Sequence, residues 1–258
     1  MSADTDSLRR SFNESARLYD QMRPGYPAAL IEDAVSLSEI PERGSILEIG
    51  CGTGQATRPF AERGYSMLCL DIGERLAAIA ARKFRRFENV TVVVQSFEEW
   101  QTEGKMFDLV MAATSFLWIA PDVRWVKSAF VLKPSGALAL LWNQHVRKDE
   151  GFFAEVQAVY KKCAPSLDAT PAKTDDLTVS TEDAGLFETP VRRTYPWTRE
   201  YTAEDYIRLL NTYSGHIVLP ENERKKLFEG VKDLINQKYG GAVVKHYEAV
   251  LELRRRKA

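Results

Sequence analysis

The 258-residue sequence contains few cysteines, and they are Cys51, Cys69 and Cys163. They are odd in number, widely spaced and never part of a Cys-x-x-Cys pair, which argues against a disulfide framework and a cysteine-based zinc site. The histidines at positions 145, 216 and 246 show no metal-ligand spacing either. We therefore expect a cytoplasmic protein, in a reducing compartment, that holds no metal ion.

The sequence also lacks an apolar run near the ~18 residues of a membrane span, and Met1 to Arg17 has no apolar core like that of a signal peptide. Neither sign of charge is in excess, since 35 Lys and Arg face 36 Asp and Glu, for a formal net charge of −1. This balance argues against a membrane or nucleic-acid partner. We interpret the basic clusters as solvated faces or a tail, with RNA contact as the alternative. These clusters are Arg82–Lys83 with Arg85–Arg86, Arg192–Arg193 and Arg254–Lys257. Nothing in the sequence indicates the oligomeric state.

Between Ser45 and Trp142, short β-rich runs alternate with helical patterns. The predicted strands are Ser45–Ile49, Tyr65–Leu70, Val90–Val94, Phe107–Ala112 and Ala137–Trp142. The predicted helices are Gln55–Arg63, Gly73–Phe84 and Pro121–Val131. Alternation at this pace predicts an α/β fold, with a parallel sheet and helices on both of its faces.

Beyond Trp142 the pattern becomes mixed. The predicted elements are a helix over Gly151–Lys162, an exposed loop over Ala164–Ser180, a strand over Val191–Tyr195, a helix from a Thr202 and Asp205 capping box through Tyr213, and a helix over Glu221–Gln237. Alternation up to Leu253 predicts a last strand whose wetter face carries His246, Glu248, Val250 and Glu252. A helical insertion of ~40 residues therefore separates the last two strands, which is longer than an ordinary connection. Insertions of that size often cover a site.

A glycine-rich turn, Glu48-Ile49-Gly50-Cys51-Gly52-Thr53-Gly54, leaves the first predicted strand and enters a helix. Glycines at alternate positions permit positive φ and let a ligand lie against the main chain. A dinucleotide-binding fingerprint needs Gly or Ala at position 55, where Gln55 stands, and a P-loop needs a lysine that this turn lacks. The turn is therefore expected to bind a nucleoside that need not carry phosphate.

Asp71 stands at the end of the second predicted strand. A carboxylate there can accept both hydroxyls of a ribose, and its charge would oppose a 2′-phosphate. The alternative is that Asp71 caps the helix Gly73–Phe84. Together with the glycine turn, Asp71 favours the ribose interpretation.

These features resemble the class I S-adenosylmethionine-dependent methyltransferases, in particular the small-molecule branch grouped as methyltransferase type 11. The resemblance rests on Glu48–Gly54, Asp71, Gln95–Glu98, Phe107–Val110 and Leu132–Leu138. It covers the chain from Ala16 to Trp142 and the terminal strand. It implies a doubly wound, mostly parallel seven-stranded sheet with an antiparallel last strand and a helical lid insertion, and S-adenosylmethionine as the cofactor.

The resemblance also implies a set of cofactor-binding residues. In the family the glycine turn holds the methionine end of the cofactor, the acidic residue binds the ribose, and residues after the third strand flank the adenine. The residues so implied are Glu48, Gly50, Cys51, Gly52, Gly54, Asp71, Ile72, Ser96, Phe97 and Thr114. Many relatives carry Asp or Asn where Ser96 stands, so an adenine contact through the backbone is the alternative there.

The segment from Phe12 to Pro27 is similar to the N-terminal part that such enzymes fold over the cofactor. Tyr19 is expected to close on the cofactor, and Arg23 to pair with a carboxylate of the cofactor or of a substrate. The alternatives are an ordinary amphipathic-helix position for Tyr19 and a solvated Arg23.

Ligands of doubly wound sheets bind beyond the carboxyl ends of the strands, which points to acceptor residues after the fourth and fifth strands. Trp118 is predicted to line the acceptor pocket or else to anchor a loop. Asn143 and Tyr213 are candidate acceptor contacts, although Tyr213 also fits a core position. His145 is the candidate general base, with a surface histidine as the alternative. A base helps a hydroxyl acceptor, whereas positioning alone suffices for a thiolate, carboxylate or neutral amine.

We therefore predict a methyltransferase that moves a methyl group directly from S-adenosylmethionine to a small-molecule acceptor. The alternatives are an RNA or protein methyltransferase and a non-catalytic S-adenosylmethionine-binding module. One domain is expected, with a helical segment over the cofactor (1–40), a cofactor-binding core (41–145), a part with the helical lid insertion (146–240) and a terminal strand and tail (241–258).

Overall fold

A computed structural model describes residues 12–146, 148–167 and 185–257 of the chain. Its strands are β1 (Ser45–Ile49), β2 (Ser66–Asp71), β3 (Val90–Val94), β4 (Phe107–Ala113), β5 (Leu132–His145), β6 (Val191–Thr202) and β7 (Ala242–Arg255). They form one seven-stranded sheet in the order β3-β2-β1-β4-β5-β7-β6. Neighbouring strands from β3 to β5 are parallel, whereas β7 runs antiparallel to both β5 and β6. The predicted α/β fold with an antiparallel last strand is confirmed.

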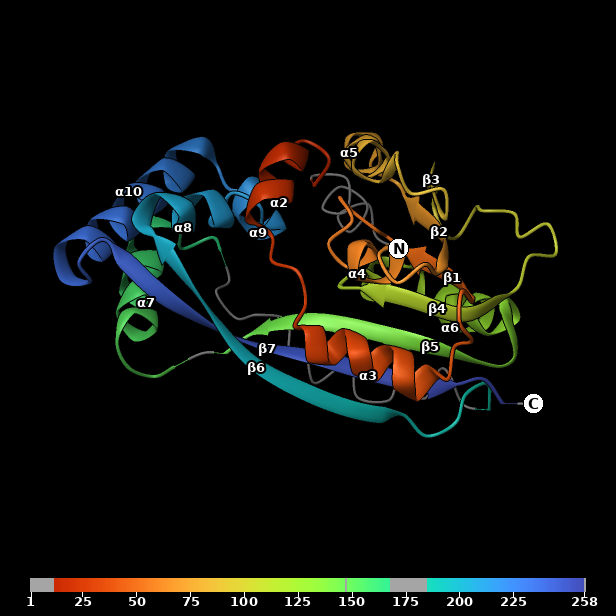
Figure 1. Ribbon diagram of the computed structural model, residues 1–258. Coiled ribbons are helices and arrows are strands. Elements are labelled where there is room, and N and C mark those ends of the chain that lie inside the picture. Colours follow the sequence, from red (N-terminus) through yellow and green to blue (C-terminus); the bar gives the residue numbers. More distant parts are fainter. Residues whose placement is uncertain (1–11, 147, 168–184, 258) are drawn as a thin grey trace.

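Helices cover both faces of this sheet and form a separate layer at one of its ends (Figure 1). The helices are α2 (Ala16–Met22), α3 (Ala28–Ser38), α4 (Thr57–Ala61), α5 (Glu74–Phe84), α6 (Pro121–Phe130), α7 (Phe152–Cys163), α8 (Ala203–Leu210), α9 (Ser214–Ile217), α10 (Glu221–Lys238) and the 3-10 helix η1 (Phe116–Trp118). No helix in the described ranges is long and apolar enough to cross a membrane.

Alternate residues of each central strand face two separate apolar layers. On β4, Leu109 and Met111 face the layer under α3, α4 and α5, whereas Val110 and Ala112 face the layer under α6. All four side chains are fully buried. Burial on both faces requires nearly continuous apolar strands, which is why β1, β2 and β4 were recognisable from the sequence.

The last strand is more deeply buried than its alternation predicts. Glu252 and Arg254, on the phase expected to be wetter, are each 2% exposed, and Val250 is fully buried. The Arg254 Nη2 atom lies 2.8 Å from Glu252 Oε1, and the guanidinium lies 4.9 Å from the centre of the Trp125 ring on α6. The prediction of a wetter face is therefore wrong for this half of β7, because α6 covers it and the two charges neutralise each other.

Several element boundaries also differ from the prediction. Strand β6 continues from Val191 to Thr202 instead of ending at Tyr195, because it pairs with β7 along its whole length. Helix α4 is shorter than the predicted Gln55–Arg63, and α8 ends at Leu210, so that Tyr213 lies outside it. The Thr202 cap is confirmed, since its Oγ1 atom accepts from Asp205 N at 3.1 Å. Most of the loop expected over Ala164–Ser180, and residues 1–11 of the N-terminal segment, lie outside the described residues.

The helical insertion between β6 and β7 forms a third apolar cluster together with α7. Leu209, Leu227, Val231 and Ile235 are its fully buried aliphatic members. Figure 1 shows this layer at the end of the molecule where β6 and β7 extend beyond the rest of the sheet. Because the layer stands beyond the carboxyl end of β5, it covers the edge at which a doubly wound sheet binds ligands.

Candidate functional site

The glycine turn follows β1 and packs against the ends of β2 and β4. Its glycines have φ values of 70°, 58° and 88° at Gly50, Gly52 and Gly54, where a side chain would be strained. The Gly50 N–H donates to Leu70 O at 2.8 Å. A Cβ atom on Gly50 would lie 2.6 Å from Cβ of Ser115, so glycine allows the end of β1 to approach the residues after β4.

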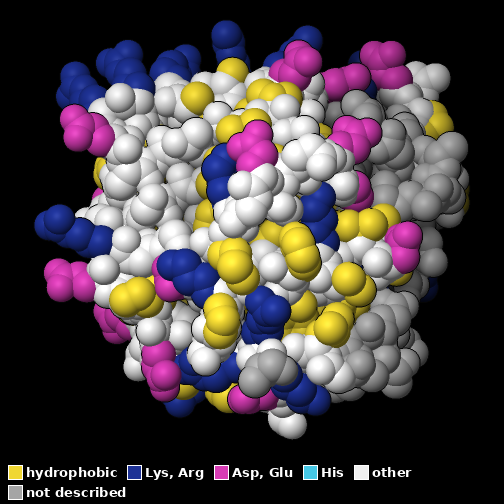
Figure 2. All heavy atoms as spheres, turned by 90° about the vertical axis from the view of Figure 1, so that its right-hand side faces the viewer, with side chains coloured by type: hydrophobic (Ala, Val, Ile, Leu, Met, Phe, Trp, Pro, Cys, Tyr) yellow, Lys and Arg dark blue, Asp and Glu magenta, His cyan; other side chains and the backbone are white. Residues whose placement is uncertain are grey.

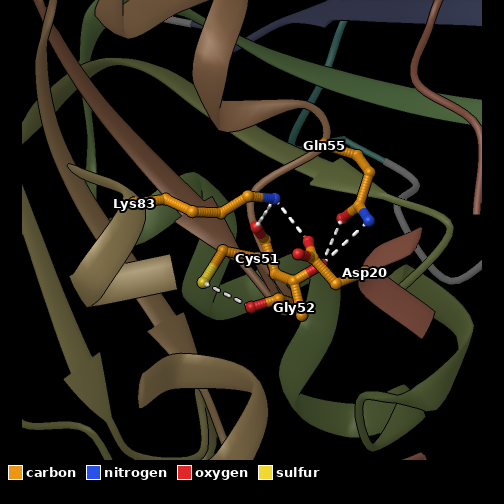
Figure 3. A network of polar contacts seen from close by, with 6 residues as sticks. Asp20, Cys51, Gly52, Gln55 and Lys83 are labelled. Carbon is orange, nitrogen blue, oxygen red and sulfur yellow. Dashed lines mark hydrogen bonds and ion pairs between the residues drawn. The ribbon is translucent and has the colours of Figure 1, made fainter. Parts of the chain in front are cut away.

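A lysine from α5 holds the N-terminal helix against this turn. Lys83 forms an ion pair with Asp20 of α2, and its Nζ atom donates to Thr53 O at 2.9 Å (Figure 3). The side chains of Lys83 and Asp20 are 26% and 24% exposed, so the pair is partly shielded from water. The interpretation of this basic cluster as a solvated face is therefore wrong for Lys83, because α2 lies over it.

Asp71 joins the turn to the end of β2. Its Oδ2 atom accepts from Gly52 N and its Oδ1 atom from Gly73 N, both at 2.7 Å, and the residue is 7% exposed. Gly73 is the N-cap residue of α5, so Asp71 does contact the start of that helix. Its side chain also lines a cavity, and a carboxylate has further lone pairs for donors there.

This smaller cavity has a volume of about 270 Å³ and lies beside Asp71, over the ends of β1, β2 and β4. The predicted cofactor residues that line it are Tyr19, Arg23, Gly50, Gly52, Asp71, Ile72, Phe97 and Thr114. Trp118 lines it as well, and its ring packs edge-on against Phe12 at 5.7 Å. Trp118 is not among the described lining residues of the larger cavity reported below, because η1 turns the chain toward the smaller cavity after β4. Its role toward an acceptor stays a prediction.

Two of the predicted cofactor residues line neither cavity. Gly54 packs against α5, where a Cβ atom would lie 2.3 Å from Cε2 of Phe84. The Ser96 Oγ atom accepts from Glu99 N at 3.2 Å and so stabilises the local turn, while Gln95 and Phe97 on either side reach the cavity. Direct cofactor contact by Gly54 and Ser96 has no support in the geometry of the two cavities.

A larger cavity of about 430 Å³ lies between the glycine turn and the helical insertion. The predicted site residues that line it are Tyr19, Arg23, Glu48, Gly50, Cys51, Thr114, Asn143, His145 and Tyr213. The two cavities adjoin, because they have lining residues in common. These shared residues, here called the rim, are Tyr19, Arg23, Gly50, Ala113, Thr114 and Tyr213.

Glu48 is fully buried on β1 beneath the larger cavity. Its Oε2 atom accepts from Thr57 Oγ1 at 2.6 Å, whereas its Oε1 atom has no hydrogen-bond partner among the described residues. Burial raises the pKa of this carboxyl to about 7, because the charged form is poorly solvated there. An unpaired buried carboxyl oxygen indicates that a donor from a ligand completes the site.

Arg23 connects the N-terminal segment to the helical insertion. Its Nε atom donates to Thr212 Oγ1 at 2.9 Å and its Nη2 atom to Thr212 O at 2.7 Å. The guanidinium also lies 5.1 Å from the ring centre of Tyr19 and 4.4 Å from that of Tyr213. Arg23 is therefore half-buried and held in place by these contacts, and it puts a positive charge at the rim.

The other predicted acceptor residues have mixed surroundings. Asn143 Nδ2 donates to Gly25 O at 2.9 Å and its Oδ1 atom accepts from Trp197 Nε1 at 3.1 Å, so both ends of the amide are engaged. His145 is exposed at the end of β5, and its Nδ1 atom lies 3.3 Å from His246 O. Asn143 therefore holds the cavity wall, whereas His145 remains accessible from the cavity.

The larger cavity also contains chemistry that the sequence analysis missed. His216 of α9 lines it, with Nε2 2.8 Å from the Tyr160 hydroxyl, and burial lowers the pKa of His216 to about 4. Lys245 of β7 lines it too, although it is only 3% exposed. Burial lowers the pKa of Lys245 to about 7, and the charge of Arg23 acts in the same direction. The remaining unpredicted aromatic lining residues are Tyr26, Phe153, Tyr206 and Tyr247.

One sequence signal pointed to Lys245. It precedes Tyr247 and Ala249 by two and four positions, so it occupies the apolar phase of the last strand. A lone lysine in that phase is an exception to the pattern. For His216 there was no such signal, because α9 is a single short turn whose position depends on the packing of the insertion.

The described residues fit a nucleoside cofactor with a charged amino-acid end. The smaller cavity combines a carboxylate with apolar walls, and the glycine turn leaves its main chain open to a ligand. The unpaired Glu48 Oε1 atom suits an ammonium group, and Arg23 suits a carboxylate. No group of three or more His, Cys, Asp or Glu in the described ranges has the arrangement of a metal site.

Comparison with known proteins supports this assignment. Residues 46–136 match a family model described as "Methyltransferase domain". The chain is similar to an uncharacterized methyltransferase of Schizosaccharomyces pombe, with 28% identity over 234 residues, which is 88% of each chain. It is also similar to a demethylmenaquinone methyltransferase of Tropheryma whipplei, with 27% identity over 188 residues, covering 69% of this chain and 77% of that protein.

Among solved structures, the YcgJ protein from Bacillus subtilis has a similar fold. It aligns with a TM-score of 0.57 and 13% identity, over 90% of this chain and all of that one. At such low identity the likeness supports the fold alone. The family match and the sequence relatives carry the assignment to a class of activity.

Proposed function

Because the chain belongs to the class I S-adenosylmethionine-dependent methyltransferases, we propose that it methylates a small-molecule acceptor held in the larger cavity. The observation that carries the proposal is the rim. Two cavities on the same sheet edge share Gly50, Thr114 and Tyr213 among their walls, so ligands in both would meet there. Methyl transfer requires donor and acceptor to be aligned in this way.

In this proposal the smaller cavity takes the nucleoside part of the cofactor. Asp71 accepts the ribose hydroxyls, since its carboxylate lines that cavity. Phe97 supplies apolar surface for the adenine. The main chain of the glycine turn, the Glu48 Oε1 atom and Arg23 bind the methionine part.

S-adenosylmethionine, when bound, supplies an activated methyl group on a positively charged sulfur. The task of this chain is then to orient the acceptor and to exclude water. Tyr19 and Arg23 close the rim from the N-terminal side, and Tyr213 closes it from the helical insertion. The insertion therefore completes the wall that separates the acceptor from solvent.

If the acceptor is a hydroxyl, His145 is the proposed proton acceptor. It lines the larger cavity at the end of β5. His216 lines the same cavity, but its Nε2 atom is engaged with Tyr160 and its pKa is lowered to about 4, which makes it a weak base. His145 is therefore the proposed base, because it is the other histidine among the described lining residues of this cavity.

Two further observations favour a small acceptor over RNA or protein. The larger cavity is walled by aromatic rings from α7, α8 and β7, and its volume of about 430 Å³ suits a small molecule. Figure 2 shows the side of the molecule away from the helical layer, and there Lys and Arg side chains stand among Asp and Glu without forming a continuous basic surface of described residues. The relative named for demethylmenaquinone is consistent with such an acceptor.

The test is a partition experiment. The protein is incubated with methyl-labelled S-adenosylmethionine and a cell extract, and the products are separated into small molecules, RNA and protein. We expect label in the small-molecule fraction, unaffected by nuclease or protease. Label that appears only in RNA or only in protein would overturn the proposal.

A further inference from the structure

The larger cavity contains a buried cation that the proposed roles do not use. Lys245 is 3% exposed, and its Nζ atom lies among three aromatic rings. The ring centres are those of Tyr247 at 5.3 Å, Phe153 at 5.5 Å and Tyr206 at 6.0 Å. These rings lie on β7, α7 and α8, so three separate elements position one ammonium group.

No carboxylate neutralises this ammonium group within the described part of the chain. The ion pairs of the described residues do not include Lys245, and no hydrogen-bond acceptor contacts it. The charge that acts on the pKa of Lys245 is that of Arg23, which is also positive. Burying a lysine without a partner is costly, and that cost is usually offset by a function.

Lys245 is placed where an acceptor, and not the cofactor, would meet it. It lines the larger cavity only, whereas the rim residues line both. Glu48, the one carboxyl among the described walls of the larger cavity, lies on β1 beside the glycine turn, whereas Lys245 lies on β7. The acceptor end of the cavity is therefore positively charged and lined by aromatic rings.

We propose that Lys245 binds a carboxylate of the methyl acceptor, so that the substrates of this enzyme are carboxylic acids with an apolar or aromatic body. This inference rests on the proposed function, because it concerns the acceptor in the same cavity. The aromatic rings hold the ammonium group in place and supply apolar surface for the body of the acid. Lys245 is thus a specificity-determining residue of the site.

The chemistry favours a carboxylate over a phosphate. A phosphate group carries up to two charges and is usually met by several donors, such as a guanidinium fork or a helix N-terminus. Here β7 contributes one ammonium group to the cavity wall. The other cation of the described wall, Arg23, already donates from Nε and Nη2 to Thr212 at the rim. One lysine matches the single charge of a carboxylate.

The experiment fractionates the acceptor before the reaction. A small-molecule extract is split on an anion exchanger into a retained pool of acids and a flow-through pool, and each pool is offered to the wild-type protein with methyl-labelled S-adenosylmethionine. We expect the retained pool to support labelling. Labelling supported only by the flow-through pool would overturn the carboxylate proposal but leave the proposed function intact. Label in no small molecule of either pool would instead refute the proposed function, and this proposal with it.

Variants then test whether Lys245 is responsible. With the retained pool, Lys245→Met should lower labelling at limiting acceptor at least about tenfold, the loss expected for one charge-assisted contact. Lys226→Met, at an exposed position of α10, should label like the wild type. Calorimetry with S-adenosylhomocysteine checks that both variants keep the cofactor site. Wild-type labelling by Lys245→Met would contradict the assignment, and the pool experiment decides the acceptor's charge even if that variant does not fold.

Discussion

Replacing Lys245 by methionine should stabilise the fold while it impairs the enzyme. The lysine is 3% exposed, and burial lowers its pKa from 10.5 to about 7. Methionine has a similar length and fits among Phe153, Tyr206 and Tyr247 without a charge to solvate. A gain in stability from deleting a functional side chain is the expected signature of a site that is maintained at the expense of the fold.

The size of the effect follows from linkage between proton binding and folding. Lowering a lysine pKa from 10.5 to about 7 corresponds to at most about 4 kcal/mol of lost stability at pH 7. Water within the cavity reduces this figure, and we expect a net gain of about 2 kcal/mol for Lys245→Met. For a chain of this length, that gain raises the melting temperature by about 4–8 °C.

The Lys245 penalty makes the stability of the wild type depend on pH in a definite direction. Between pH 7 and 10.5 the unfolded chain keeps the Lys245 proton and the folded chain has lost it, so wild-type stability rises with pH in this window. Below pH 7 the penalty is complete. Arg23, His216, Tyr206 and Tyr247 also face the ammonium group. Burial lowers the pKa of His216 to about 4 and raises the pKa of both tyrosines, so none of the three changes charge across most of this window, and a guanidinium keeps its charge in proteins.

The assay is thermal unfolding of wild type, Lys245→Met and the exposed control Lys226→Met, followed by circular dichroism. The advantage of Lys245→Met should be close to its full value at pH 7 and fall to about a third of that value near pH 9.5. The control should unfold like the wild type at each pH. A less stable Lys245→Met variant, or a gain that does not change with pH, would refute the reasoning.

Three further predictions concern the cofactor site, the glycine turn and the base. Asp71→Asn should weaken S-adenosylhomocysteine binding by about 2 kcal/mol, because an amide cannot replace the charged acceptor. The control Asp122→Asn, at an exposed position, should leave the affinity unchanged. Equal affinities of the two variants in calorimetry would remove Asp71 from the ribose site. Gly54→Ala should lower the free energy of unfolding in urea by about 2 kcal/mol more than Gly64→Ala does. Both glycines have positive φ, but only a side chain at position 54 would clash with Phe84. Equal losses of stability would contradict this contact. For a hydroxyl acceptor, His145→Ala should lower kcat about a hundredfold with cofactor affinity unchanged, and full turnover would eliminate His145 as the base.

The cofactor half of the site was predictable because local sequence determines it. The glycine turn follows a buried strand and Asp71 ends the next one, so the parallel topology alone brings them together. The two predicted cofactor residues that line neither cavity also have local explanations. The Ser96 hydroxyl accepts a hydrogen bond from Glu99 N, and Gly54 leaves room for the ring of Phe84.

The acceptor half could not be predicted in the same way. Its walls come from α7, α8, α9 and β7, which meet only through long-range packing of the helical insertion. Trp118 illustrates the difficulty, because the short helix η1 after β4 directs its ring to the smaller cavity. Lys245 was visible only as a polar exception on an apolar strand phase, and its meaning depends on the rings that surround it.

The central claim is that a donor in the smaller cavity meets an acceptor in the larger one at the rim. A crystal structure of the protein with S-adenosylhomocysteine tests it most directly. The account predicts the ribose hydroxyls on Asp71, and the sulfur at Gly50 and Thr114 facing the larger cavity. A nucleoside bound in the larger cavity, or a sulfur that faces away from it, would contradict the account.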